Sequence, residues 1–571
     1  MVDTQKMYNT WMSQDIEDSD LVEDLLQIKD DESEIYERFY KNLDFGTAGI
    51  RGVLGAGTNR MNIYTVGQST QGLCVYLNRH YENPKVAIAY DSRIKADVFS
   101  FLSADIFAAN GIEVYIYKEL MPTPMLSYAV RELGCSAGIN VTASHNPAKY
   151  NGYKVYDSTG TQIGPEIADK IKEYIEDIDI FSGVKKMGFD KAVECGKVKF
   201  IDDSIIESYY EKTLEQQINR SVAKQAELKM VYTPLNGTGN KPVREILHRI
   251  GVSDVVVVKE QEMPDGNFPT CPYPNPEIKE ALDLGIKLSL KENADILLAT
   301  DPDCDRVGIA VNNGGDMQLI SGNEVGILLL DYICRERTQQ GTMPKNPVAI
   351  KSIVSSELAA KVAEQYGVEM RNVLTGFKFI GEQIMELEEA KEVDRFIFAY
   401  EESYGYLVGS HVRDKDAVVG SMLIAEMASY YKLKGKTLLD VLDEIYAKYG
   451  YFLNVTVSHE FDGAAGMKKM SDIMEGLREN PPKNVGEQKI VSIKDILSSI
   501  ETFSDGKTAT LNMHKSNVLI YSLDNGCSFI VRPSGTEPKI KVYFTTVDKS
   551  KANAMKKYDE LSTDVNKLLN L

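Results

Sequence analysis

Ser144 is the residue whose surroundings most suggest chemistry. It lies in Val141-Thr142-Ala143-Ser144-His145-Asn146-Pro147, directly after the apolar run 136–141. Because Asn-Pro continues neither strand nor helix easily, we expect Ser144 on a strand-end loop. A serine hydroxyl needs a base, a metal ion or a phosphoryl group to react. Neighbouring side chains on an extended backbone face opposite ways, so a simple pair with His145 is not expected.

Three carboxylates alternate in a second loop, Asp301-Pro302-Asp303-Cys304-Asp305-Arg306, which follows the apolar run 296–299. Carboxylates spaced in this way can converge on one hard cation, and Mg²⁺ prefers oxygen ligands. An EF-hand would need Gly at its sixth position and Glu at its twelfth, where this chain has Arg306 and Asn312. Because three negative charges without a cation repel one another, we expect a Mg²⁺ site rather than a calcium module or a solvated turn.

Two further loops carry groups that can bind a sugar or a phosphate. Glu401 and Ser403 follow another apolar run, and side chains two residues apart on extended backbone share a face suited to sugar hydroxyls. The segment 532–538, Arg-Pro-Ser-Gly-Thr-Glu-Pro, offers a guanidinium, two hydroxyls and an open backbone that can enclose a phosphate. Either segment alone could be a surface turn.

Two glycine-containing segments accompany these loops. Residues 45–52 hold three glycines around Arg51, which permits close approach to an anion, but they lack the Gly-Lys-Ser/Thr of a P-loop. Thr375-Gly376-Phe377-Lys378 precedes an expected helix. Neither segment alone supports a function.

The elements that must position these loops alternate between β-prone and helical. This pattern is typical of α/β domains with largely parallel sheets, which keep their chemistry at strand ends. The β-prone runs are 85–90, 114–117, 229–232, 255–258, 296–299, 348–350 and 396–399.

The two ends of the chain differ from its middle. Residues 7–43 read as helical, with Trp11 as a packing anchor and an apolar stripe of Leu21, Leu25, Leu26 and Ile28. Near the C-terminus, a helix over 552–569 follows closely spaced strands, which predicts an antiparallel α+β module with strands at 518–521, 528–531 and 540–544.

Composition limits the partners and the compartment. With 571 residues, the chain should form three to five domains at about 150 residues each. A net charge of -20 argues against nucleic acid or anionic membrane as the main partner. Seven cysteines without a Cys-x-x-Cys pair argue against zinc and disulfides. No apolar run approaches the ~20 residues of a membrane span, and no signal peptide is apparent, so we expect a cytoplasmic protein of unassigned oligomeric state.

Taken in order, the segments resemble the α-D-phosphohexomutase superfamily, which includes the phosphoglucomutase/phosphomannomutase family. Residues 142–147 with Asn151-Gly152-Tyr153-Lys154 match its phosphoserine loop, and 301–306 match its metal loop. Residues 401–405 match its sugar-recognition loop, and 532–538 match its phosphate-binding loop. Four motifs in the family's order and spacing make the match specific, and it extends from about Phe45 to the C-terminus.

The resemblance implies an α/β fold with three α/β domains of mixed sheets around a central cleft and a smaller C-terminal α+β domain. We expect an N-terminal helical extension over 1–44. The domains that follow should be 45–208 with the phosphoserine loop, 209–323 with the metal loop, 324–452 with the sugar loop and 453–571 with the phosphate-binding loop.

The resemblance also implies a role for each matched residue. Ser144 would carry the transferable phosphoryl group and would hold Mg²⁺ together with Asp301, Asp303 and Asp305. Near the reacting group would lie Arg51, His145, Lys154 and Arg306. Contacts to the sugar and its phosphate would come from Thr375, Gly376, Lys378, Glu401, Ser403, Arg532, Ser534, Gly535 and Thr536. The general base stays open between Lys154 and His145, with Lys415 as a third candidate.

The implied reaction moves a phosphoryl group between two positions of one sugar. Phospho-Ser144 would donate to a hexose monophosphate, and the bisphosphate would reorient and return its other phosphate. We expect a Mg²⁺-dependent phosphoglucomutase that interconverts glucose 1-phosphate and glucose 6-phosphate, with glucose 1,6-bisphosphate as intermediate and activator. Mannose or pentose phosphates are the alternative substrates. A non-catalytic sugar-phosphate-binding protein fits less well, because Ser144 and the three aspartates are intact.

Two positions depart from the family pattern. Pro302 replaces the usual glycine of the metal loop and removes its amide donor. Phe377 stands where several glucose-specific relatives have tryptophan. The N-terminal extension, residues 46–52 and residues 412–419 are most similar to the longer type of phosphoglucomutase, whose relatives include phosphopentomutases.

Overall fold

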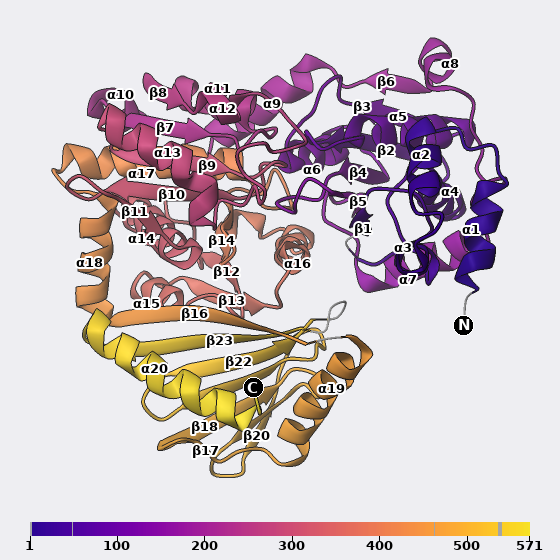
Figure 1. Ribbon diagram of the computed structural model, residues 1–571. Helices are drawn as coiled ribbons and strands as arrows, with labels where there is room; N and C mark the ends of the chain where they lie inside the picture. The colour runs from indigo at the N-terminus through magenta and orange to yellow at the C-terminus, as the bar shows by residue number, and fades with distance from the viewer. Residues whose placement is uncertain (1–2, 48, 462, 535–538) are drawn as a thin grey trace. The chain divides into compact units, whose positions relative to one another are not determined.

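The computed structural model describes residues 3–47, 49–461, 463–534 and 539–571, with only the backbone of 463–465. The chain divides into two compact units, each described by itself below (Figure 1). The first comprises Met1–Gly322, Ile380–Ala399 and Ser403–Gly435. The second comprises Asn323–Phe379, Tyr400–Glu402 and Lys436–Leu571.

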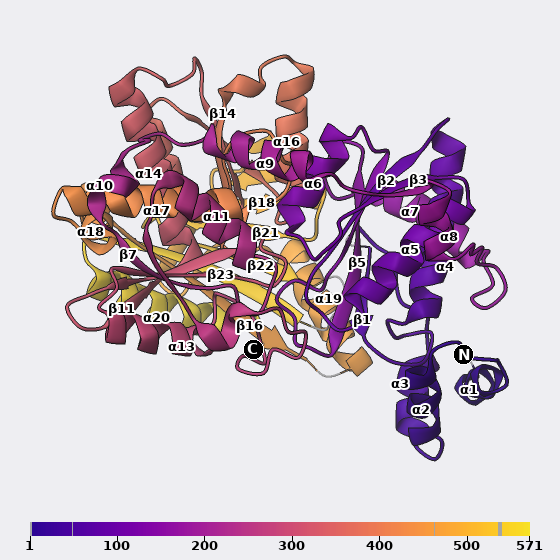
Figure 2. The ribbon, with the colours of Figure 1, turned by 90° about the horizontal axis from the view of Figure 1, so that it is seen from above.

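Three short helices, α1 (Thr4–Met12), α2 (Ser19–Gln27) and α3 (Glu32–Phe39), form the N-terminal extension (Figure 2). An aspartate caps each helix by accepting a hydrogen bond from an early backbone N–H. Trp11 is fully buried, with its ring 5.3 to 5.8 Å from three others, those of Phe39, Tyr64 and Phe181. The expected anchoring role of Trp11 is therefore confirmed, but Leu26, assigned to the buried stripe, is 53% exposed.

The first unit contains a six-stranded mixed sheet in the order β1-β5-β4-β2-β3-β6. The pairs β4–β2, β2–β3 and β3–β6 are parallel, whereas β1–β5 and β5–β4 are antiparallel. The strands are β1 (Ile50–Val53), β2 (Lys85–Tyr90), β3 (Glu113–Ile116), β4 (Ala137–Val141), β5 (Tyr150–Asp157) and β6 (Val198–Phe200). Their helices are α4 (Ile63–His80), α5 (Ala96–Ala109), α6 (Thr123–Glu132), α7 (Pro165–Glu176), α8 (Phe189–Glu194) and α9 (Asp203–Leu214).

A second mixed sheet of the same unit has five strands in the order β11-β10-β9-β7-β8. The pairs β9–β7 and β7–β8 are parallel, and the edge pairs β11–β10 and β10–β9 are antiparallel. The strands are β7 (Lys229–Thr233), β8 (Asp254–Val257), β9 (Ile296–Thr300), β10 (Val307–Asn312) and β11 (Met317–Ile320). The helices are α10 (Val222–Ala226), α11 (Asn240–Ile250), α12 (Lys259–Glu262) and α13 (Lys279–Glu292).

Helix α17 (Ala417–Leu433) completes the core around this second sheet. It is buried from Ala417 to Tyr431 and packs against α10, α11 and β10. Asp416 caps it by accepting hydrogen bonds from the N–H groups of Val418 and Val419. This cap fixes the start of the helix and, with it, the segment that carries Lys415.

The second unit begins with α14 (Gly322–Gln340) and a parallel strand pair, β12 (Val348–Ser352) with β13 (Glu369–Val373). Helices α15 (Leu358–Gln365) and α18 (Leu438–Tyr449) belong to the same unit. Helix α16 (Phe377–Glu389) and β14 (Phe396–Glu401) pass between the two units along the chain. The 3₁₀ turn η1 (Val393–Arg395) and β15 (Gly405–Leu407) lie in the first unit.

The C-terminal part of the second unit is an eight-stranded antiparallel sheet. Its order is β16-β23-β22-β21-β18-β19-β20, and β17 pairs with β18. Helix α20 (Lys551–Leu568) packs on β16 and β23, and α19 (Gly463–Glu479) also contacts β23 (Figure 1). The strands are β16 (Tyr451–Glu460), β17 (Asn484–Val485), β18 (Gln488–Asp495), β19 (Ile500–Phe503), β20 (Thr508–Thr510), β21 (Leu519–Leu523), β22 (Ser528–Pro533) and β23 (Lys539–Asp548).

The expected elements agree with the structure. The seven β-prone runs correspond to β2, β3, β7, β8, β9, β12 and β14, within one or two residues at each end. The predicted antiparallel module with a final helix corresponds to the sheet that contains β21, β22 and β23, followed by α20. The fold thus supplies the strand ends on which the candidate residues lie.

Candidate functional site

Ser144 lies on the loop that follows β4, as expected, but its backbone is left-handed, with φ +53°. Its N–H donates to Thr142 Oγ1 at 2.8 Å, and its hydroxyl donates to Asp301 Oδ2 at 3.0 Å. The Ser144 Oγ also lies 3.1 Å from Nδ1 of His145. The expectation that these neighbours face apart was therefore wrong, because it assumed an extended backbone at Ser144.

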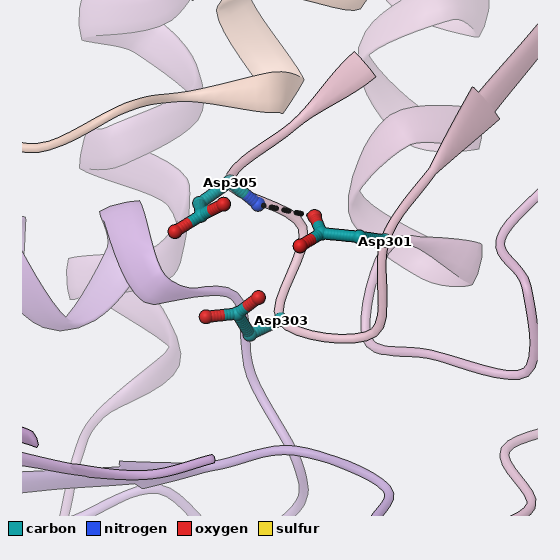
Figure 3. A group of neighbouring side chains, drawn as sticks. All are labelled: Asp301, Asp303 and Asp305. Atoms are coloured by element: carbon teal, nitrogen blue, oxygen red, sulfur yellow. Dashed lines mark hydrogen bonds between the residues drawn. The ribbon is translucent and has the colours of Figure 1, made fainter. Parts of the chain in front are cut away.

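The three aspartates converge, as predicted, in the tight turn that joins β9 to β10 (Figure 3). All three are buried, and one carboxylate oxygen of each lies within 4.8 Å of the others. The N–H of Asp305 donates to Asp301 Oδ1 at 3.1 Å (Figure 3). The N–H of Arg306 donates to the same oxygen at 2.9 Å, and the two hydrogen bonds orient the carboxylate. Thr238 donates twice to the Pro302 carbonyl, so the proline is accommodated within the turn.

The donor set fits a hard divalent cation. Within the part of the chain that the structure describes, Asp303 Oδ1 and Asp305 Oδ1 are buried without a hydrogen-bond partner. Burial and the neighbouring carboxylates raise the pKa of Asp301 well above its ordinary value, and the same causes raise the pKa of Asp305. Burial acts in the same direction on Asp303, but the charge and hydrogen bond of Lys154, together with hydrogen bonds from Asp301 and Thr123, outweigh it and lower the pKa of Asp303. Such a crowded set of oxygens can hold a metal ion.

Two lysines offset part of this negative charge. Lys154, on β5, places Nζ 2.7 Å from Asp303 Oδ2 and 3.7 Å from Asp305 Oδ2. Lys415 Nζ lies 3.1 Å from Asp305 Oδ2 and 3.2 Å from Asp414 Oδ1. Tyr156 donates to Asp414 at 2.9 Å, which fixes the acidic partner of Lys415. Both predicted lysines therefore contact the carboxylate cluster.

The remaining predicted residues of this group also lie near the phosphoserine loop or the metal turn. Arg51 is on β1 and donates to Asn146 Oδ1 at 3.3 Å. Arg306 follows the turn and donates to Glu277 Oε1 at 2.6 Å. Burial and the cationic neighbours Arg306 and Arg51 hold the pKa of His145 well below its ordinary value. At neutral pH His145 is therefore uncharged, and an uncharged imidazole has one ring nitrogen that can accept a proton.

Sequence reasoning missed several polar residues that support the site. Thr123, at the start of α6, donates to Asp303 Oδ2 at 2.8 Å and accepts from Asn140 Nδ2 at 2.7 Å. Asp91 and Arg93 follow β2 and contact the Ser144 loop. The rule that singled out the other loops, polar residues directly after a buried strand, applies to Asp91-Ser92-Arg93 as well and could have identified it.

In the second unit, Glu401 and Gly376 are in direct contact. Gly376 donates its N–H to Glu401 Oε1 at 2.7 Å, and its φ of +120° requires glycine. Thr375 Oγ1 is buried and, among the described residues, without a hydrogen-bond partner. Lys378 lies in the first turn of α16, over the Phe379 ring. The segment 375–378 and Glu401 thus form one local cluster.

Glu401 and Ser403 do not share an extended backbone, which their predicted pairing required. Strand β14 ends at Glu401, and residues 402–404 form a turn in which Tyr404 has φ +65°. Glu402 points to two serines of the β12 end, and its Oε2 accepts from Ser352 at 2.9 Å and from Ser355 at 3.4 Å. The turn is therefore held by Glu402, a residue not among those predicted.

The fourth predicted loop is described only in part. Arg532 lies near the end of β22, and its Nη1 donates to the Tyr543 hydroxyl at 3.4 Å. Ser534 donates its N–H to the Lys539 carbonyl at 2.7 Å. Gly535 and Thr536 lie outside the described residues.

Among the helices that are described, none is both long enough and apolar enough to cross a membrane.

Comparison with known proteins finds the same family along the chain. Residues 42–180, 207–315 and 321–449 match the models described as phosphoglucomutase/phosphomannomutase alpha/beta/alpha domains I, II and III. Residues 484–558 match the C-terminal domain of that family.

Individual relatives agree with the family models. A phosphoglucomutase of Staphylococcus saprophyticus is 38% identical over 506 residues, 88% of this chain and 90% of the relative. A phosphoglucomutase of Staphylococcus aureus is 40% identical over 513 residues, with coverage of 89% and 90%. The crystal structure of a putative phosphomannomutase from Thermus thermophilus is similar in fold, with a TM-score of 0.69 and 20% identity over 93% of this chain and all of that one.

Proposed function

Since the chain belongs to the phosphoglucomutase/phosphomannomutase family, we propose that it interconverts glucose 1-phosphate and glucose 6-phosphate. The observation that carries the proposal is the contact of the Ser144 hydroxyl with Asp301 in the buried carboxylate cluster. The curated relatives named above are phosphoglucomutases, which favours glucose over other sugars. The protein is then an isomerase that acts by phosphoryl transfer within one small-molecule sugar phosphate, and its compartment is the cytoplasm.

The reaction begins with a phosphoryl group on Ser144. The free hydroxyl of the bound sugar phosphate attacks phosphorus, the bond to Ser144 Oγ breaks, and a bond to the sugar oxygen forms. The proton of the sugar hydroxyl ends on Ser144 Oγ, and the product is glucose 1,6-bisphosphate. The bisphosphate reorients in the site and returns its other phosphoryl group to Ser144, which regenerates the phosphorylated enzyme. For the same reason, the bisphosphate can phosphorylate and so activate protein that lacks the phosphoryl group.

Charge neutralisation is the main physical requirement of this transfer. A phosphoserine carries about -1.5 to -2 charges near neutral pH, and the substrate adds a second anion. Asp301, Asp303 and Asp305, with the Ser144 phosphate, would hold Mg²⁺, which neutralises charge on the phosphoryl oxygens when bound. Lys154 and Lys415, already against the carboxylates, supply fixed positive charge to the same centre.

The sugar and its distal phosphate are assigned to other loops. Glu401, Ser403, Thr375, Gly376 and Lys378 would contact the sugar, and the buried Thr375 hydroxyl supports this role. Arg532, Ser534, Gly535 and Thr536 would bind the phosphate that does not react, and Arg51 and Arg306 the one that does. The proposed domains are the N-terminal extension over 1–44 and four domains over 45–208, 209–323, 324–452 and 453–571.

His145 is the candidate that exchanges a proton with Ser144 Oγ, because its Nδ1 lies 3.1 Å away. Replacement by glutamine keeps a polar side chain but removes the titratable ring, so kcat should fall by about 10² to 10⁴. Lys154→Met and Lys415→Met, measured in parallel, test the other two candidates. Unchanged kcat in His145→Gln together with a large loss in one lysine variant would transfer the role to that lysine.

Substrate choice is tested by parallel turnover assays. Glucose, mannose, glucosamine and ribose 1-phosphates are supplied to the Mg²⁺-loaded protein, each with its own bisphosphate as primer. We expect the highest kcat/KM with glucose 1-phosphate. A higher value with mannose or ribose 1-phosphate would make the protein a phosphomannomutase or phosphopentomutase of the same mechanism. Binding without turnover of any sugar would instead indicate a sugar-phosphate-binding protein.

A further inference from the structure

Arg93 is a fully buried arginine whose guanidinium holds the backbone of the Ser144 loop. Its Nη2 donates to the carbonyls of Ser144 and Asn146, and its Nη1 donates to those of Pro147 and Tyr150, both at 3.0 Å. The side chain is entirely inaccessible to solvent, and its Nε lies 3.3 Å from Asp91 Oδ2. A buried guanidinium is costly unless it is hydrogen-bonded and paired, and here four carbonyls accept from its two Nη atoms while the Asp91 carboxylate supplies the opposite charge.

Asp91 reaches the other side of Ser144. Its Oδ2 accepts a hydrogen bond from Thr142 Oγ1 at 2.5 Å, and Thr142 Oγ1 in turn accepts from the Ser144 N–H at 2.8 Å. The Ser144 carbonyl is held by Arg93, as described above. The Asp91–Arg93 pair therefore fixes both peptide groups that flank the Ser144 Cα.

This arrangement bears on the unusual conformation of Ser144. A left-handed backbone is unfavourable at a residue other than glycine and persists only where the surroundings impose it. That conformation directs Oγ toward Asp301 and His145 at once. Holding the two peptide groups thus determines where the reactive oxygen lies.

The loop 265–268, which belongs to the same unit, packs against Arg93 and its turn. The Phe268 ring lies 5.1 Å from the guanidinium carbon. Gly266 packs so closely that a Cβ there would lie 2.5 Å from Ile94 N and 2.7 Å from Ser92 O. The turn that carries Arg93 is consequently held between the Ser144 loop and the loop 265–268.

We propose that Arg93 is a positioning residue for phosphoryl transfer, which sets the backbone of Ser144 and so aims its Oγ at the metal turn and His145. The proposal rests on the function proposed above. Lysine cannot replace arginine in this role, because one ammonium group cannot span carbonyls that belong to four residues. Because its side chain is inaccessible to solvent, Arg93 has no surface that could contact the sugar or the phosphate, so its loss should affect the transfer step rather than substrate binding.

The test compares Arg93→Lys and Arg93→Ala with the unmodified chain, all loaded with Mg²⁺. Because a displacement of about 1 Å at a reacting group can cost about 10²-fold, kcat should fall by that factor while KM for glucose 1-phosphate stays the same. The rate at which Ser144 acquires label from ³²P-glucose 1,6-bisphosphate should fall in parallel. Melting temperature and circular dichroism establish that Arg93→Lys is folded.

A matched control and a measurement without substrate complete the test. Arg79→Lys makes the same change at an exposed arginine of α4, which stacks on Tyr174, and should keep wild-type kcat. A crystal structure of Arg93→Lys should show Ser144 outside the left-handed region, whatever sugar the protein uses. Wild-type kcat, or a positive φ retained at Ser144, would overturn the proposal. Absence of turnover in the unmodified chain would instead contradict the proposed function. The φ angle of Ser144 in the Arg93→Lys crystal structure would then still show whether Arg93 sets the backbone of Ser144.

Discussion

Ser144→Ala should lower turnover of glucose 1-phosphate by about four orders of magnitude or more, because removal of a covalent nucleophile typically has an effect of this size. The alanine methyl group cannot carry a phosphoryl group, and the hydroxyl that contacts Asp301 is lost. Steady-state kcat and incorporation of ³²P from labelled glucose 1,6-bisphosphate are the two measurements. Both should fall to background while the melting temperature stays close to that of the unmodified chain.

Ser158→Ala is the matched control for this experiment. Ser158 is an exposed serine of the same sheet-and-helix region, beyond the end of β5. Its loss should change neither kcat nor ³²P incorporation. If Ser144→Ala kept appreciable turnover, the phosphoryl carrier would have to be another residue, and the mechanism proposed above would be incorrect.

Removal of divalent cations is the second change with a large expected effect. Chelation with EDTA should reduce kcat by about 10³-fold or more, since a metal ion supplies several kcal/mol of transition-state stabilisation. Added Mg²⁺ should restore activity and raise the melting temperature, because it binds the folded carboxylate cluster and relieves repulsion among Asp301, Asp303 and Asp305. Activity assays and thermal unfolding on the same samples check both effects.

Asp303→Asn distinguishes the cluster from other metal sites. It removes one charge from the cluster and the nearer of the two carboxylates that contact Lys154, so Mg²⁺ should no longer raise the melting temperature of the variant. Asp316→Asn, at an exposed position between β10 and β11, should respond to Mg²⁺ as the unmodified chain does. Full activity in EDTA would show that transfer at Ser144 needs no metal ion.

The catalytic loops were predictable because they follow a simple rule of position. Ser144, Asp301 and Glu401 each lie at the end of a short, buried, mostly apolar strand or within three residues after it, and such strands are recognisable from sequence. The three aspartates converge as their alternation indicated. What the sequence could not supply is the partner of each group, because Lys154 and Asp303 are 149 residues apart and meet only through the packing of two sheets.

The errors have a common origin in local backbone geometry. The predicted separation of Ser144 from His145 and the predicted pairing of Glu401 with Ser403 both assumed extended chain. The structure has a left-handed Ser144 in the first case and a three-residue turn in the second. The residue types of these loops do not favour either conformation. In the first loop, hydrogen bonds to Arg93 and Asp91 hold the backbone. In the second, Ser352 and Ser355 donate to Glu402.

The N-terminal extension has a spectroscopic consequence. Trp11 is the sole tryptophan of the chain, so ultraviolet excitation at its red edge selects one indole, enclosed by the rings of Phe39, Tyr64 and Phe181. The extension is also tied to the turn that carries Arg93, because Asp18 and Asp20 hold Lys95 Nζ at 2.6 and 2.7 Å. The wavelength of maximum Trp11 fluorescence therefore reports whether the extension is packed against that turn, without a label on the protein.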